Sequence, residues 1–148
     1  MNWTLEVVCV PVSGVDRAKR FYAEQLGFHV DFDSSPDENT RLVQLTPPGS
    51  GCSIVIGNGL FARPGAPVPE VDMAPGTLHG LQLVVRDIRA ARAELAARGV
   101  DVTEVQVYGK DLRLRPATDE DELNNVGFCF FDDPDGNSWA VQQITARD

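Results

Sequence analysis

The chain has 148 residues, 43% of them hydrophobic and 24% charged, with a formal net charge of −9. These values fit one globular domain, and the acidic excess disfavours nucleic acid as a partner, because phosphate binding needs a basic surface. No apolar run reaches membrane-spanning length, and the first residues, MNWTLEVVCVPVS, lack the basic start and apolar stretch of a secretory signal. We therefore expect a cytoplasmic protein.

The first part of the chain predicts a strand, a helix and three more strands. β-branched residues dominate 5–12 and favour a strand. Ser13 is a candidate N-cap for the next helix, and Gly27 fits the left-handed residue at its end. The three further strands are expected at 28–33, 40–46 and 52–57, the last two joined by the turn PPGSG.

The second part repeats this order. Residues 12–30 and 85–102 align once one residue is deleted before the glycine, so that Gly27 matches Gly99. Asp87 is a candidate cap for the second helix. Strands are expected at 80–85, 100–107, 126–132 and 138–144, with DPDGN as the turn between the last two. The repeat indicates that one structural unit is used twice.

This organisation predicts an α+β fold of two βαβββ units within a single domain, 1–148. The first unit covers 1–57 and the second covers 79–148. Residues 58–78 between them are rich in Pro and Gly, so we expect an exposed linker loop. The segment 108–124 is expected to be a long loop that can serve as a lid.

Several short motifs occur together in this order: V-S-x-V-D-R-A-x-x-F-Y, then L-G-F, and near the end F-x-D-P-D-G-N-x-W. In this combination the chain resembles the vicinal oxygen chelate superfamily, which includes glyoxalase I, extradiol dioxygenases and bleomycin-resistance proteins. The resemblance covers nearly the whole chain. It implies a curved mixed sheet around a ligand cavity and a homodimer.

In metal-using members of that superfamily, four strand residues hold the cation. The resemblance carries these positions to Val7, Ile54, Gly80 and Ala140. None of these side chains has a donor for a divalent metal, which needs imidazole or carboxylate ligands. A register shifted by one residue would instead offer Glu6, His79 and Trp139, and tryptophan is not a ligand. The chain is therefore expected to have no metal and no cofactor.

Side chains two residues apart on a strand share a face, so the neighbours of these positions are expected to line the cavity. The predicted ligand-binding residues are Val7, Cys9, Ile54, Gln82, Phe130, Ala140 and Gln142. Either Phe128 and Phe130 or Cys129 and Phe131 must face inward, and the resemblance favours Phe130. Such a pocket is mostly apolar with a few amide and thiol groups, which suits a small-molecule ligand but also a filled core.

Three functions are compatible with these observations. The first is a metal-independent, bleomycin-resistance-like protein that binds a small organic molecule without chemistry. The second is a glyoxalase-like or dioxygenase-like metalloenzyme with a non-standard site. The third is a scaffold or partner-binding module whose cavity has collapsed. The three cysteines, Cys9, Cys52 and Cys129, are expected to be free thiols because they form no C-x-x-C pair and their number is odd.

Overall fold

The computed structural model of the chain describes residues 1–58 and 73–146. It has an α+β fold with two compact units. The first unit is Met1–Leu78 together with Asp133–Asn137, and the second is His79–Asp132 together with Ser138–Asp148. Most of the predicted linker, 58–78, lies outside the described residues.

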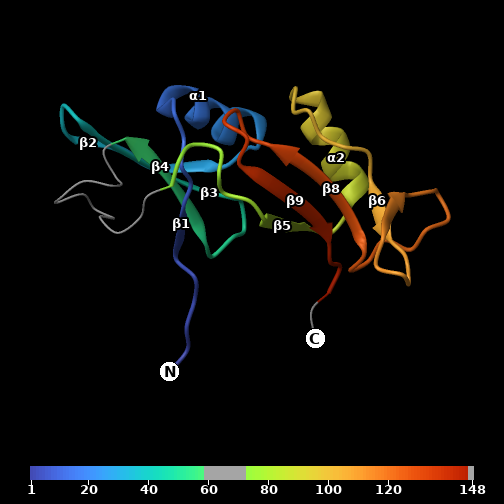
Figure 1. Cartoon of the computed structure of the whole chain (residues 1–148). Helices are drawn as coiled ribbons and strands as arrows, with labels where there is room; N and C mark the ends of the chain where they lie inside the picture. The colour runs from blue at the N-terminus through green and yellow to red at the C-terminus, as the bar shows by residue number, and fades with distance from the viewer. Residues whose placement is uncertain (59–72, 147–148) are drawn as a thin grey trace. The chain divides into compact units, whose positions relative to one another are not determined.

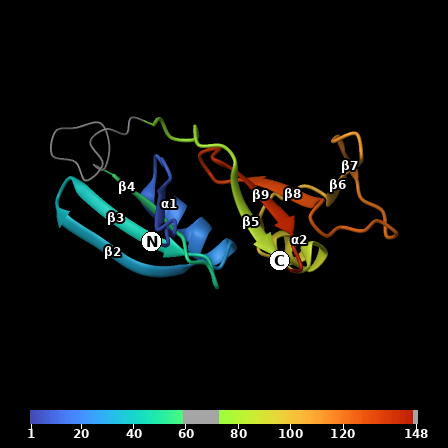
Figure 2. The ribbon, with the colours of Figure 1, turned by 90° about the horizontal axis from the view of Figure 1, so that it is seen from below.

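The first unit contains a mixed four-stranded sheet (Figures 1 and 2). Its strands lie in the order β1-β4-β3-β2, with β1 parallel to β4 and the other pairs antiparallel. The helix α1 continues directly into a π-helical segment. The elements are β1 (Val7–Cys9), α1 (Val15–Arg20), the π-helical segment (Phe21–Gln25), β2 (His29–Asp37), β3 (Thr40–Thr46) and β4 (Ser53–Asn58).

The second unit has the same topology with one extra strand. Its order is β5-β9-β8-β6-β7, and β5 is parallel to β9 as β1 is to β4. The predicted duplication is therefore present in the fold. The elements are β5 (Leu81–Val85), α2 (Ile88–Ala97), β6 (Gln106–Tyr108), β7 (Leu114–Pro116), β8 (Gly127–Asp132) and β9 (Ser138–Gln143).

The helix ends follow the prediction at three of four places. Asp87 caps α2, because its Oδ1 accepts a hydrogen bond of 3.0 Å from the backbone N–H of Ala90. Gly27 and Gly99 both have positive φ, as expected where a helix ends in a left-handed residue. Ser13 is not the N-cap: α1 begins after Gly14, without a side-chain cap. Its hydroxyl is instead bonded to Asp135.

The strand predicted at 100–107 is largely wrong, since only Gln106–Tyr108 forms β6. The alternating valines of this segment are buried, which produces the strand-like pattern without ladder pairing. Its partner β7 lies inside the segment 108–124 that was expected to be a loop. The two strands form a hairpin at the edge of the second sheet.

One face of each sheet packs against the helix of its own unit. In the second unit α2 contacts β8 and β9 (Figure 1), and in the first unit α1 contacts β4. The buried side chains of these helix-covered faces include Val43, Leu45, Ile54 and Ile56 in the first unit, and Cys129, Phe131, Trp139 and Val141 in the second.

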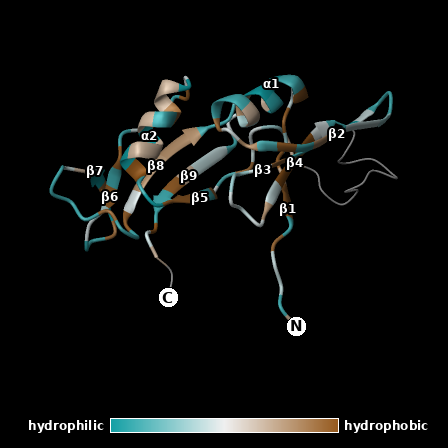
Figure 3. Ribbon diagram, turned by 180° about the vertical axis from the view of Figure 1, so that it is seen from behind, coloured by the Kyte–Doolittle hydropathy of each residue, from teal (hydrophilic) through white to brown (hydrophobic). Residues whose placement is uncertain are grey.

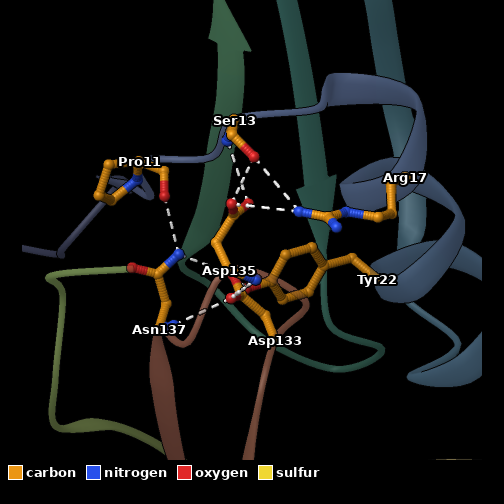
Figure 4. A network of polar contacts seen from close by, with 7 residues as sticks. All are labelled: Pro11, Ser13, Arg17, Tyr22, Asp133, Asp135 and Asn137. Atoms are coloured by element: carbon orange, nitrogen blue, oxygen red, sulfur yellow. Dashed lines mark hydrogen bonds and ion pairs between the residues drawn. The ribbon is translucent and has the colours of Figure 1, made fainter. Parts of the chain in front are cut away.

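The turn DPDGN makes a buried polar network within the first unit (Figure 4). The Tyr22 hydroxyl donates to Asp133 Oδ2 at 2.7 Å, and Asn137 Nδ2 donates to the same oxygen at 2.7 Å and to the Pro11 carbonyl at 2.8 Å. Asn137 Oδ1 accepts from the backbone N–H of Leu78 at 3.1 Å. The turn that was predicted only to reverse the chain also completes the core of the first unit.

A second, more exposed part of this network surrounds Asp135 (Figure 4). Its carboxylate accepts from the Ser13 backbone N–H at 3.0 Å and from the Ser13 hydroxyl at 2.5 Å. Arg17 Nη2 lies 3.2 Å from the same carboxylate. The serine that the sequence offers as a helix cap thus fixes the carboxylate of a distant turn.

Hydrophobic residues are concentrated on β5 and β8, while the outer end of the β2–β3 hairpin is hydrophilic (Figure 3). In the described part of the chain, neither helix is long and apolar enough to cross a membrane.

Candidate functional site

The second sheet has one face that α2 does not cover, and we call it the open face. Cross-strand partners project to the same side of a sheet, so the register identifies its members. Gln82 pairs with Ala140, which pairs with Phe130 on the next strand. The open face includes Gln82, Val84, Gln106, Tyr108, Phe128, Phe130, Ala140 and Gln142, with Asp132 and Ser138 at one end.

Four of the predicted ligand-binding residues come together on this face. Gln82, Ala140 and Phe130 lie side by side across β5, β9 and β8. Gln142 follows two residues after Ala140 and pairs with Phe128. Phe128 and Phe130 are half-buried and project away from α2, whereas Cys129 and Phe131 are buried beneath it. The expected alternation of β8 is therefore present, with both Phe128 and Phe130 on the open face.

Three aromatic rings form a continuous row on the open face. The rings of Phe128 and Phe130 are nearly parallel, 8° apart, with centroids separated by 6.1 Å. The ring of Tyr108, at the end of β6, meets Phe128 edge-on with centroids 5.3 Å apart. Both arrangements are favourable for aromatic pairs. Tyr108 was missed from the sequence because it follows the predicted strand directly and was assigned to the loop.

The polar groups of the open face form a hydrogen-bonded chain beside the aromatic row. Gln82 Nε2 donates to Gln142 Oε1 at 2.5 Å. Gln142 Nε2 in turn donates to the backbone carbonyl of Asn125 at 2.8 Å. Asn125 was also missed, and the only sequence signal for it is that asparagine tolerates the left-handed backbone found here, with φ 67°. Two glutamine amides are thus held in place next to Phe128 and Phe130.

The first sheet corrects one of the predicted residues. Val7 pairs with Ser53, Val8 with Ile54, and Cys9 with Val55. Ile54 therefore projects to the opposite face from Val7 and Cys9, and it is buried on the helix-covered side, where it pairs with Leu45. The expectation that Ile54 shares a face with Val7 is wrong. The repeat makes Val55 the counterpart of Ala140, because Cys9 pairs with Val55 as Gln82 pairs with Ala140.

The corresponding face of the first sheet is more polar. Thr46 donates to Asp31 Oδ2 at 2.5 Å, and Gln44 Nε2 donates to the same atom at 3.1 Å. These hydrogen bonds, the one from Thr46 first, lower the pKa of the Asp31 carboxyl. The hydroxyls of Thr46 and Ser53 lie 2.6 Å apart. This face thus has hydrogen-bonded hydroxyl, amide and carboxylate groups beside the aromatic ring of Phe32, which pairs with Gln44.

The corrected positions do not fit a divalent metal. They are Val7 and Val55 in the first unit and Gly80 and Ala140 in the second, and none has a nitrogen, oxygen or sulfur atom in its side chain. The register shifted by one residue does not fit a metal either, because it would use Trp139, which is buried under α2. Within residues 1–58 and 73–146, no three His, Cys, Asp or Glu side chains gather as they would around a cation.

Neither histidine is hydrogen-bonded to a cysteine thiol. His79 Nδ1 lies 3.0 Å from the Ser138 hydroxyl, and His29 Nε2 lies 3.9 Å from an Asp31 oxygen. Burial raises the pKa of the Cys9 thiol, and burial raises the pKa of Cys129 to about 11. A nucleophilic cysteine needs the opposite shift. These two thiols are therefore protonated and suited to packing rather than to attack.

The family model described as "Glyoxalase/Bleomycin resistance protein/Dioxygenase superfamily" matches residues 4–141. No curated protein sequence matches the chain. Many solved structures match the chain.

TnmS3, an antibiotic binding protein from Streptomyces sp. CB03234, is 29% identical with a TM-score of 0.66, and 97% of each chain is covered. A glyoxalase/bleomycin resistance protein from the same organism is 30% identical with a TM-score of 0.63, covering 95% of this chain and 100% of that one. A superfamily member from Sphaerobacter thermophilus DSM 20745 is 26% identical with a TM-score of 0.68, covering 96% and 98%. The chain belongs to the glyoxalase/bleomycin resistance protein/dioxygenase superfamily.

Proposed function

We propose that this protein binds a small organic molecule on the open face of its second sheet and releases it chemically unchanged. The observation that carries the proposal is the row of Tyr108, Phe128 and Phe130 beside the paired amides of Gln82 and Gln142. Apolar sites with a few well-placed polar groups are typical of small-molecule binding. The similarity to an antibiotic binding protein supports the same class of ligand.

A metal-dependent lyase or oxygenase is the less supported function. Enzymes of that kind place imidazole or carboxylate groups around the cation, and the corresponding positions here are Val7, Val55, Gly80 and Ala140. The thiols of Cys9 and Cys129 have raised pKa values, so they do not supply a ready nucleophile either. The open face instead offers aromatic rings for stacking and amide groups for hydrogen bonding.

The test uses 2-naphthol as a fluorescent aromatic probe. We expect saturable binding, with the largest NMR shifts at the amides of β8 and β9. Phe130→Ala removes one ring of the row and should weaken binding about tenfold. Phe32→Ala is the matched control, because Phe32 is also a partly exposed strand phenylalanine but lies on β2 in the first unit. It should leave the affinity unchanged.

Two results would refute this function. One is an affinity that Phe130→Ala and Phe32→Ala change equally. The other is binding or conversion of the probe that requires added Zn²⁺ or Ni²⁺ and disappears with a chelator. Chromatography of the probe after incubation distinguishes binding from conversion, and unaltered 2-naphthol is the expected result.

We also propose that the chain forms a homodimer. The support is a run of exposed apolar residues before β1: Trp3 is 85% exposed and Leu5 is 68% exposed. Large exposed apolar groups close together indicate an interaction surface. Light scattering after gel filtration should give twice the chain mass, and Trp3→Asp with Leu5→Asp should reduce it. A monomer mass for the unmodified chain at all concentrations would contradict the dimer.

A further inference from the structure

We infer that Gln82 presents a hydrogen-bond acceptor to the ligand, and that the open face therefore selects aromatic molecules with an O–H or N–H donor. This inference rests on the proposed function and specifies its ligand class. It follows from the direction of the hydrogen-bonded chain Gln82–Gln142–Asn125, which one backbone group determines.

The fixed point of this chain is the carbonyl of Asn125. A backbone carbonyl can only accept hydrogen bonds. The residue itself is held in place, because its backbone N–H donates to the Gln143 carbonyl at 2.8 Å. The amide group of Gln142 that lies 2.8 Å from this carbonyl must therefore be the NH₂ group. Its oxygen then points toward β5.

The orientation of Gln82 follows from that of Gln142. Because Gln142 Oε1 is an acceptor, the group of Gln82 that approaches it to 2.5 Å must be the NH₂ group. The side-chain oxygen of Gln82 therefore takes no part in this hydrogen-bonded chain. Among the described residues, no donor is bonded to this oxygen. The side chain is exposed, so the oxygen is available to a ligand.

The surroundings of this oxygen define the molecule that suits it. Gln82 and Phe130 lie on either side of Ala140, two strand spacings or about 10 Å apart. Between them, Ala140 contributes only a half-buried methyl group. A bicyclic aromatic molecule that stacks on Phe130 and extends across Ala140 can direct a hydroxyl or amine toward Gln82.

A ligand without such a donor would cover the Gln82 oxygen and leave it unbonded. A buried acceptor that loses its water without a replacement partner is costly, and sites of this kind reject analogues that lack the matching group. A hydrogen bond of this type corresponds to about tenfold in affinity. The same argument disfavours a ligand that presents only acceptors at this point.

The test compares 2-naphthol with 2-methoxynaphthalene, which has the same rings but no donor. The protein should bind 2-naphthol about tenfold more tightly. Gln82→Met keeps the length of the side chain without its oxygen, and this preference should then fall to near unity. Gln44→Met is the matched control, because Gln44 is also a strand glutamine whose Nε2 donates a side-chain hydrogen bond, but it lies on β3 in the first unit. It should keep the preference.

Each outcome decides the inference. Equal affinities of the unmodified protein for the two probes would overturn it, while weakening of both by Phe130→Ala would leave the proposed function standing. A tenfold preference that persists in Gln82→Met would also overturn it. If neither probe binds, both the inference and the proposed function fail. The comparison on the unmodified protein does not depend on the folding of any variant.

Discussion

The hydroxyl of Tyr22 donates a 2.7 Å hydrogen bond to Asp133, across 111 residues of sequence, and both side chains are at most 5% exposed. The same carboxylate accepts from the side chain and backbone of Asn137 and from the backbone of Asp135. The turn DPDGN is therefore held in the first unit by a carboxylate whose two oxygens are both bonded.

Removing one donor from this network should cost stability without abolishing the fold. Tyr22→Phe keeps the ring, which stacks near Phe28 with centroids 5.8 Å apart, and should lower the free energy of unfolding by about 1–2 kcal/mol. Asp133→Ala leaves several buried donors without an acceptor and should cost about 3–5 kcal/mol. Urea denaturation measures both values. Tyr108→Phe is the control, and equal effects at both tyrosines would contradict this account.

Gly76 should not tolerate any side chain. Its φ is +83°, and a Cβ at this position would lie 2.1 Å from the Asp135 carbonyl oxygen. Gly49 has nearly the same φ, +81°, with nothing within 4 Å. Gly49→Ala should therefore cost about 1 kcal/mol from backbone strain alone, while Gly76→Ala should cost on the order of 3 kcal/mol or prevent folding. Similar melting temperatures for the two variants would argue against the close contact.

Leu112 offers a route to greater stability. It lies between β6 and β7 with φ +61° and is 81% exposed, so it carries backbone strain without burying its side chain. Leu112→Asn places there a residue that tolerates this conformation and should raise the free energy of unfolding by about 0.5–1 kcal/mol. Thermal unfolding provides the measurement. A lower melting temperature would show that the leucine side chain has a stabilising contact.

The ion pairs of Asp33 should make stability depend on pH. Hydrogen bonds from Arg41, and then from Lys19, hold the pKa of this carboxyl well below its ordinary value of 3.8. Because the folded-state pKa is lowered, the stabilisation is complete above the unfolded value and is lost as the pH falls below about 3.8 toward the folded value.

Asp33→Asn should therefore destabilise the protein at pH 7, by about 1 kcal/mol for these partly exposed pairs, and the difference from the unmodified chain should shrink below pH 4. Glu120→Gln, at an exposed carboxyl with no ion pair among the described residues, is the control. A difference between Asp33→Asn and the unmodified protein that is constant from pH 7 to pH 2 would contradict the pKa shift.

Cys129 should resist alkylation in the folded protein. It is fully buried, and burial raises its thiol pKa to about 11, so little thiolate exists at pH 8. Iodoacetamide followed by peptide mass spectrometry should modify Cys129 only after denaturant is added. Cys52 is half-buried and serves as the internal comparison. Equal labelling of Cys52 and Cys129 in the native state would refute the prediction.

Much of the second sheet could be predicted from sequence, because the alternation of side chains along its strands and the internal repeat assign the same residues to the same face. Gln82, Phe130, Ala140 and Gln142 share a face as expected. In the first sheet the same counting failed at Ile54. Six residues, 47–52, connect β3 to β4, whereas five residues, 133–137, connect β8 to β9. One additional residue in the turn moves every later side chain to the other face.

The remaining features depend on contacts that alternation does not encode. Tyr108 joins the aromatic row because a short hairpin brings β6 beside β8. Asn125 enters the site through its backbone carbonyl, which is the same group in every residue type. Ser13 had the sequence of a helix cap, but its hydroxyl bonds to Asp135, 122 residues away. The local alternation of side chains predicts which face of a sheet a residue occupies, but it does not predict which distant residue its side chain contacts.

The inclusion of residues 133–137 in the first unit has a consequence for how the polypeptide can be divided. A fragment ending at Leu78 would lack Asp133 and Asn137, so the Tyr22 hydroxyl, the Pro11 carbonyl and the Leu78 amide would lose their partners. Such a fragment should stay disordered by itself and gain structure only when the complementary C-terminal piece is mixed with it. During synthesis on the ribosome, the first unit would accordingly become complete only after the hairpin of β8 and β9 has emerged.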